Sequence, residues 1–95
     1  MALEHMVWLT PKSGVSEAQM EAIVASIRAL THIPGVTAIS AGKNVTERAN
    51  GATYGVLVTL ADVQALPKYI NHPDHQAVGV VLRKHCEVLA LDYER

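Results

Sequence analysis

The sequence predicts one α+β domain in which an antiparallel sheet carries helices on one face. The chain has 95 residues, which suits a single domain, expected to span residues 1–95 with its core at about 3–94. Apolar residues alternate in some segments and recur every three to four positions in others, as strands and helices require. In chain order the segments give β-α-β-β-α-α-β, with no internal repeat.

The composition predicts an aliphatic core that benefits from a second subunit. Hydrophobic residues make up 49% of the chain, yet it has one Trp, three Tyr and no Phe. A chain this short buries only about 60–65% of the surface that it exposes when unfolded. The single cysteine, Cys86, excludes an internal disulfide. We therefore expect stability to come partly from association with another copy.

Charge and hydropathy exclude several classes of partner. The net charge is −1 and the basic residues are scattered, so no nucleic-acid partner is expected. No run of about 18 apolar residues is present, so no membrane partner is expected. The N-terminal residues do not resemble a signal peptide, and a lone cysteine suits a reducing compartment. The expected location is the cytoplasm.

The first predicted strand covers Leu3 to Thr10 and is bounded by Pro11. Because side chains alternate along a strand, its residues divide between two faces. One face carries Leu3, His5, Val7 and Leu9, and the other carries Met6 and Trp8. Both faces are largely apolar, so we expect both to be covered.

The next segment predicts an amphipathic helix. Ser16 and Gln19 form a capping box at its start. Apolar residues then follow helical spacing at Met20, Ile23, Val24, Ile27 and Leu30. The helix is expected to end near residues 31–32, ahead of the Pro34-Gly35 pair.

The remainder alternates strands and helices. Predicted strands cover 36–43, 52–60 and 88–93, and residues 44–51 form a polar loop. A short helix is expected from Asp62 to about Ile70, although Pro67 should kink it or delay its start. Pro73 suits the first position of another helix, which runs to about Cys86.

This order of elements is typical of a ferredoxin-like fold, here a βαββααβ variant with a four-stranded antiparallel sheet. Helices on one face leave the other face apolar and uncovered. The simplest cover is the same face of a second copy, and symmetric pairs are the commonest oligomers. We therefore expect a homodimer whose two sheets close into an α/β barrel.

Five segments resemble the stress-responsive A/B barrel domain, or Dabb, over about residues 5–94. They are HMVWL at 5–9, IPGV at 33–36, GKNV at 42–45, YINHPDHQAV at 69–78 and LALDYE at 89–94. The Tyr-x-x-His-Pro-x-His string within the fourth is the most specific. The resemblance implies a dimeric α/β barrel with a role in stress responses, and many members have no assigned chemistry.

The resemblance also implies candidate site residues. One plant member of the family is a polyketide cyclase that closes a linear chain by aldol condensation. Its general base matches His75, and the residue that orients this base or binds the developing oxyanion matches Tyr69. The residue that matches His5 lies in the same pocket. That enzyme has a histidine where this chain has Tyr54, which implies a different reaction or a pocket of different shape.

The residue types alone leave two interpretations of these side chains open. His72 and His75 are three residues apart at a helix start, and a histidine can take up and return a proton near neutral pH. Tyr69 could donate a hydrogen bond to an enolate oxygen, with His5, Tyr54 and His72 lining the pocket. Alternatively, His72 caps the helix, and Tyr69 and His75 serve the core.

Two main functions follow from these interpretations. The first is a binding or structural module without turnover, accepting at most a small hydrophobic ligand. The second is a cofactor-independent enzyme of the cyclase, isomerase or lyase kind, with His75 as base and Tyr69 as helper. A heme-degrading oxygenase shares the broad fold class but has less support around His75. No metal site is expected, since the two histidines lack the i, i+4 spacing of zinc helices.

Overall fold

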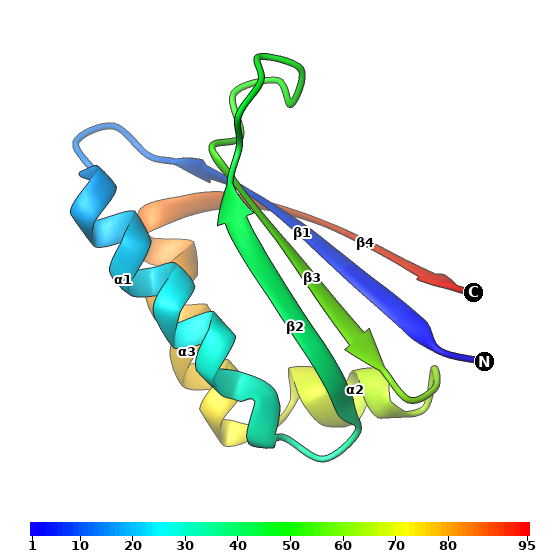
Figure 1. Cartoon of the computed structure of the whole chain (residues 1–95). Helices are drawn as coiled ribbons and strands as arrows, with labels where there is room; N and C mark the ends of the chain where they lie inside the picture. The colour runs from blue at the N-terminus through cyan, green and yellow to red at the C-terminus, as the bar shows by residue number, and fades with distance from the viewer.

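The computed structural model describes all 95 residues and has the predicted order of elements. Four strands form one antiparallel sheet in the order β2-β3-β1-β4 (Figure 1). The strands are β1 (Leu3–Pro11), β2 (Val36–Lys43), β3 (Tyr54–Leu60) and β4 (Cys86–Glu94). The helices are α1 (Glu17–Arg28), a 3₁₀ turn η1 (Ala29–His32), α2 (Ala65–Ile70) and α3 (Pro73–His85). The ferredoxin-like prediction is confirmed.

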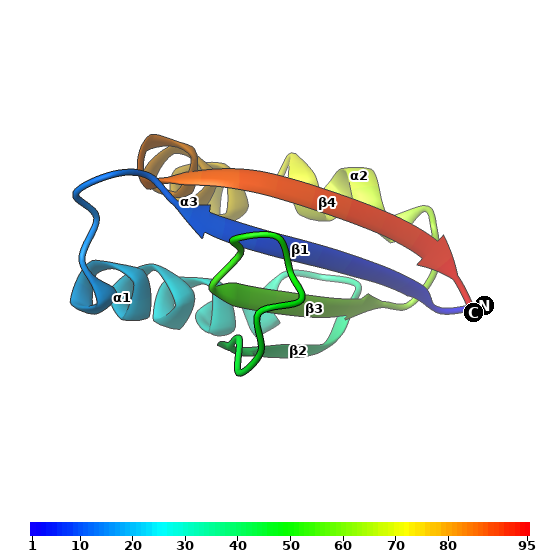
Figure 2. The same ribbon diagram turned by 90° about the horizontal axis from the view of Figure 1, so that it is seen from above.

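The helices cover only one face of the sheet. Figures 1 and 2 show α1, α2 and α3 gathered on the same side, with no element across the other side. The main core lies between this helical layer and the sheet, and it is aliphatic as predicted. Its most deeply buried side chains include Leu9, Met20, Val24, Ile33, Val58, Leu60 and Tyr69.

Side-chain alternation along β1 divides the sheet as predicted. Leu3 and Leu9 are buried on the helical side, and His5 lies there with them. Trp8 alternates to the opposite side and is 43% exposed. On β4, the side chains of Leu89 and Leu91 share the side of Trp8, because they pair with Trp8 and Met6.

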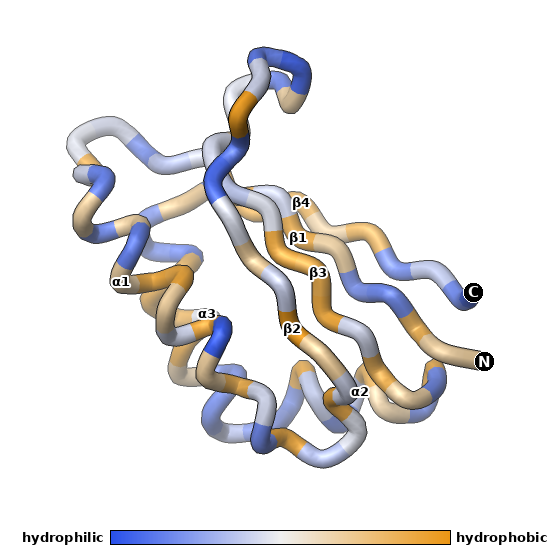
Figure 3. Tube along the Cα trace, in the orientation of Figure 1, coloured by the Kyte–Doolittle hydropathy of each residue, from blue (hydrophilic) through white to orange (hydrophobic).

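The uncovered face of the sheet is apolar. Its large exposed side chains are Trp8, Leu89, Leu91 and Tyr93, between 43% and 63% exposed. Apolar residues recur along β1, β3 and β4 in Figure 3. We call the set Met6, Trp8, Leu89 and Leu91 the bare-face cluster; these side chains frame a hollow of about 180 Å³ on the surface. Contiguous apolar surface of this kind marks a site of association.

Helix α1 begins as its capping box predicts. The Gln19 amide donates to the Ser16 hydroxyl at 3.1 Å, and the Ser16 amide donates to the Gln19 side chain at 2.8 Å. The α-helical part ends at Arg28, and η1 continues the turn to His32. The helical segment therefore ends where the sequence indicates, with its last turn tightened.

Three other boundaries shift by a few residues. Helix α2 begins at Ala65 rather than Asp62, which places Pro67 in its first turn, where no helical hydrogen bond to its nitrogen is needed. The Asp62 carboxylate accepts from the Ala65 amide at 3.0 Å. Strand β3 begins at Tyr54 rather than residue 52, and β4 is longer at both ends than predicted, since it pairs along all of β1.

The helices are short. The longest, α3, has 13 residues, and none of them has both the length and the apolarity that crossing a membrane requires.

Substitution of Gly35 should destabilise the fold through two separate effects. Gly35 has φ of 93°, and a Cβ there would lie 2.8 Å from the Cβ of Ala65. We expect Gly35→Ala to lower the free energy of unfolding by about 2–4 kcal/mol, from backbone strain plus this clash. Denaturant titration measures the change.

Gly14→Ala is the matched control. Gly14 has φ of 85°, but an added Cβ meets nothing within 4 Å, so only backbone strain applies. We expect its loss to be about 1–2 kcal/mol. Equal losses for the two variants would contradict the close packing of Gly35 on α2.

Candidate functional site

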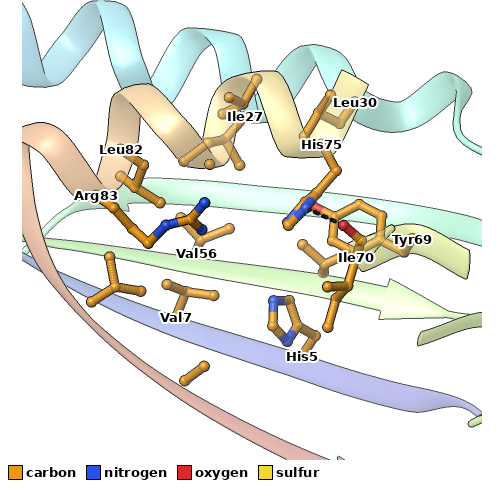
Figure 4. Close-up of a pocket in the computed structure, with 15 residues that line it drawn as sticks. His5, Val7, Ile27, Leu30, Val56, Tyr69, Ile70, His75, Leu82 and Arg83 are labelled. Carbon is orange, nitrogen blue, oxygen red and sulfur yellow. Dashed lines mark hydrogen bonds between the residues drawn. The ribbon is translucent and has the colours of Figure 1, made fainter. Parts of the chain in front are cut away.

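A cavity of about 160 Å³ lies between the helical layer and the sheet (Figure 4). Eleven of its 15 lining residues are hydrophobic. An engineered cavity of about 150 Å³ is known to hold benzene, so this one can accept a molecule with a single ring or a short alkyl chain. Its apolar wall includes Val7, Ile27, Leu30, Val56, Val58, Ile70, Val78, Leu82, Val88 and Ala90.

Four polar side chains converge on this cavity from three elements. His5 comes from β1, Tyr69 from α2, and His75 and Arg83 from α3 (Figure 4). The ring centroids of Tyr69 and His75 are 4.5 Å apart, and those of His5 and Tyr69 are 5.9 Å apart. An apolar cavity with a few converging polar groups is the usual form of a small-molecule site.

The imidazole of His75 is held by the last residue of α2. Its Nδ1 lies 3.0 Å from the carbonyl oxygen of Ile70, which can only accept, so Nδ1 carries the proton in the neutral ring. Nε2 is then the nitrogen with a free lone pair. Burial lowers the pKa of His75 below its usual 6.5, and the nearby His5 and Arg83 lower it further. At neutral pH this ring is uncharged and can accept a proton.

His5 is oriented by a carboxylate from the neighbouring strand. Its Nδ1 lies 2.5 Å from Oδ1 of Asp92, which is directly opposite in the antiparallel register of β1 and β4. This contact fixes the ring and leaves Nε2 of His5 available to the cavity. Asp92 was not among the predicted site residues. Its place opposite His5 depends on the register between β1 and β4, which the local sequence of neither strand determines.

Tyr69 provides a hydroxyl in an apolar setting. The residue is 2% exposed, and burial raises its pKa to about 12. The hydroxyl therefore remains protonated at all physiological pH values. It has no hydrogen-bond partner elsewhere in the chain and is free to donate to a bound molecule.

Two residues predicted to line the pocket lie elsewhere. Tyr54 is buried, and its hydroxyl donates to the Glu21 carboxylate of α1 rather than lining the cavity. His72 caps α3: its Nδ1 accepts from the Asp74 amide at 3.1 Å. His72 precedes the first helical residue, whereas His75 is within the helix, so the two side chains serve different purposes.

The cavity lies on the helical side of the sheet. His5 shares this face with Val7 and Leu9, as the alternation along the first strand predicts, and all the lining residues come from one chain. Nowhere in the chain do three His, Cys, Asp or Glu side chains come close enough together to hold a metal ion.

Comparison with known proteins shows the family and the fold of the chain. The model of the Stress responsive A/B Barrel Domain matches residues 3–95. The chain belongs to this family. The A/B barrel chain is also 34% identical over 97 residues to olivetolic acid cyclase from Cannabis sativa, covering 98% of this chain and 96% of the cyclase.

Solved structures show the same fold. A dimeric ferredoxin-like protein of unknown function from Jannaschia sp. CCS1 has a TM-score of 0.82 at 30% identity, with both chains covered completely. Hydroxynitrile lyase from Passiflora edulis has a TM-score of 0.87 at 22% identity, over 97% of this chain and 91% of the lyase. The A/B barrel fold thus occurs both in enzymes and in proteins without an assigned activity.

Two of the five histidines should titrate on opposite sides of pH 6.5. Burial lowers the pKa of His75, whereas the hydrogen bond to Asp74, at 2.7 Å, raises the pKa of His32. We expect NMR titration to give midpoints in this order. Because folding disfavours the proton on His75, its contribution to stability is complete above pH 6.5 and declines as the pH falls to its folded pKa.

Asp74→Asn is the control for this titration. It should return the midpoint of His32 towards 6.5 and leave that of His75 below 6.5. A His75 midpoint at or above that of His32 in the native protein would contradict the described burial.

Proposed function

We propose that this A/B barrel protein binds one small, mostly apolar molecule in its cavity. The observation that carries the proposal is the combination of an apolar wall with a few unoccupied hydrogen-bonding groups, Tyr69 and His75 foremost. A structural module without a ligand has no need of such an arrangement, because side chains would fill the space. The buried thiol of Cys86 and the net charge of −1 support a cytoplasmic protein without a nucleic-acid partner.

Filling the cavity should abolish ligand binding. Ala90 lines it from β4, so Ala90→Phe places a ring where a ligand would lie. We expect phenylacetamide to shift the NMR signals of Tyr69 and His75 in the native protein and to leave them unmoved in the variant. Leu91→Phe, on the opposite face of the same strand, is the matched control and should retain binding. Binding that survives Ala90→Phe would place the ligand elsewhere.

We further propose that the protein functions as a homodimer joined through the bare-face cluster. The apolar residues there are too exposed for a lone protomer, and the similar protein from Jannaschia is dimeric. Since the cavity is enclosed within one chain, the dimer carries two separate sites. Pairing of the sheet faces would produce the α/β barrel that gives the family its name.

A charge within the bare-face cluster should separate the subunits. Leu91 is 62% exposed in the protomer, so Leu91→Arg should leave the fold intact but bury an unpaired charge in the dimer. We expect sedimentation equilibrium to show at least about a tenfold weaker association. Val80→Arg, 63% exposed on α3, is the control and should remain dimeric. Unchanged association of Leu91→Arg would assign the interface to another surface.

A second candidate function is cofactor-independent proton transfer, as in a cyclase, isomerase or lyase. The neutral His75 favours it, because its free Nε2 can remove a proton from a carbon next to a carbonyl group. The Tyr69 hydroxyl would then donate to the enolate oxygen, and His75 would return the proton to the product. Similarity to olivetolic acid cyclase supports this candidate.

Exchange of carbon-bound hydrogen in D₂O tests the second candidate. We expect the protein to accelerate exchange next to the carbonyl group of phenylacetone, as measured by NMR. His75→Gln should reduce the acceleration by at least about a hundredfold, since it removes the base. Tyr69→Phe should reduce it less. His85→Gln, a histidine of the same helix outside the cavity, is the control. Equal exchange rates in all four proteins would exclude His75 as a base.

A further inference from the structure

Arg83 places a positive charge at the wall of a mostly apolar cavity. Its guanidinium extends from α3 towards the space between the helix and the sheet (Figure 4). The side chain forms no ion pair and no hydrogen bond within the chain, whereas Lys43 is paired with Glu17. The residue is exposed, so the guanidinium keeps contact with water while it lines the cavity, and a ligand that enters the cavity can reach it.

No carboxylate of the chain is available to neutralise Arg83. The cavity lining contains neither Asp nor Glu. Asp92 is held by His5 from the neighbouring strand, and Asp74 is held by His32. The remaining polar groups that face the cavity are two imidazoles and the Tyr69 hydroxyl, none of which carries a negative charge at neutral pH. Arg83 is therefore the one lining residue with a permanent charge.

Gly79 makes room for this guanidinium. It lies one turn before Arg83 on α3 and is buried. A Cβ at this position would lie 3.0 Å from Nη1 and 3.5 Å from Nη2 of Arg83. Glycine within a helix costs about 1 kcal/mol relative to alanine. The missing side chain lets the guanidinium lie flat against the helix and reach the cavity, so Gly79 and Arg83 act together.

We propose that Arg83 binds the carboxylate of the ligand, which is then a small apolar acid rather than a neutral molecule. The planar guanidinium matches a carboxylate with two parallel hydrogen bonds, which an ammonium group cannot reproduce. In such a complex the apolar part of the acid lies against Val56, Val78 and Leu82. This inference rests on the proposed ligand-binding function and specifies the class of the ligand.

Phenylacetate and phenylacetamide distinguish an acidic ligand from a neutral one, because the two compounds have nearly the same size and shape and differ in charge. We expect isothermal titration calorimetry and NMR to show phenylacetate binding the native protein about tenfold or more tightly than the amide. Arg83→Gln should remove this preference, so that the variant binds the two compounds with about equal affinity. Arg83→Lys should retain part of it, because the charge remains while the paired geometry is lost.

Two further variants control for fold and for general charge. Lys84→Gln removes a neighbouring charge outside the cavity and should keep the full preference. Gly79→Ala should keep or raise helix stability, yet weaken phenylacetate binding selectively by displacing the guanidinium.

The outcomes distinguish carboxylate binding by Arg83 from the binding of a small apolar molecule in the cavity, on which it rests. Equal affinity of the native protein for both compounds overturns the role of Arg83 and leaves the cavity as a site for neutral molecules. A preference for phenylacetate that survives Arg83→Gln, or that Lys84→Gln removes equally, also overturns it. Failure of both compounds to bind overturns the proposed function together with the inference.

Discussion

The alternation of side chains along β1 is the constraint on which the rest of the structure depends. This strand lies between β3 and β4, so it is an interior strand that is hydrogen-bonded on both sides. One face places His5, Val7 and Leu9 under the helices, and the other places Met6 and Trp8 on the uncovered side. A shift of one residue in register would exchange the two sets, exposing the core residues and burying Trp8.

The same alternation places the cavity and the bare-face cluster on opposite faces of one small sheet. The helical face encloses the cavity, and its polar groups are positioned by neighbouring elements: the Ile70 carbonyl holds His75, and Asp92 holds His5. The opposite face presents large exposed apolar side chains, which frame a second hollow lined by hydrophobic residues alone. The hydrogen bonds that position His5 and His75 involve no residue of the bare-face cluster.

Local signals predicted most of the fold, and long-range contacts account for what they missed. The capping box of Ser16 and the position of Pro73 depend on a few neighbouring residues, and both helices begin where these residues indicate. His5, Tyr69 and His75 were named together because of a resemblance to a family. Asp92 and Arg83 were not named, because the strand register and the space above Gly79 appear only when distant segments pack. Tyr54 was predicted to line the pocket, whereas its hydroxyl donates to Glu21 of α1, a contact that also depends on the packing of distant segments.

One NMR experiment tests the separation of the two faces most directly. Methyl spectra of the native protein are recorded at several protein concentrations, and again with increasing phenylacetate at a fixed concentration. We expect dilution to move the signals of Leu89 and Leu91, and the ligand to move those of Val56, Val78 and Leu82. If both series move the same methyl groups, the cavity and the association surface are one site, which would contradict the separation of the two faces.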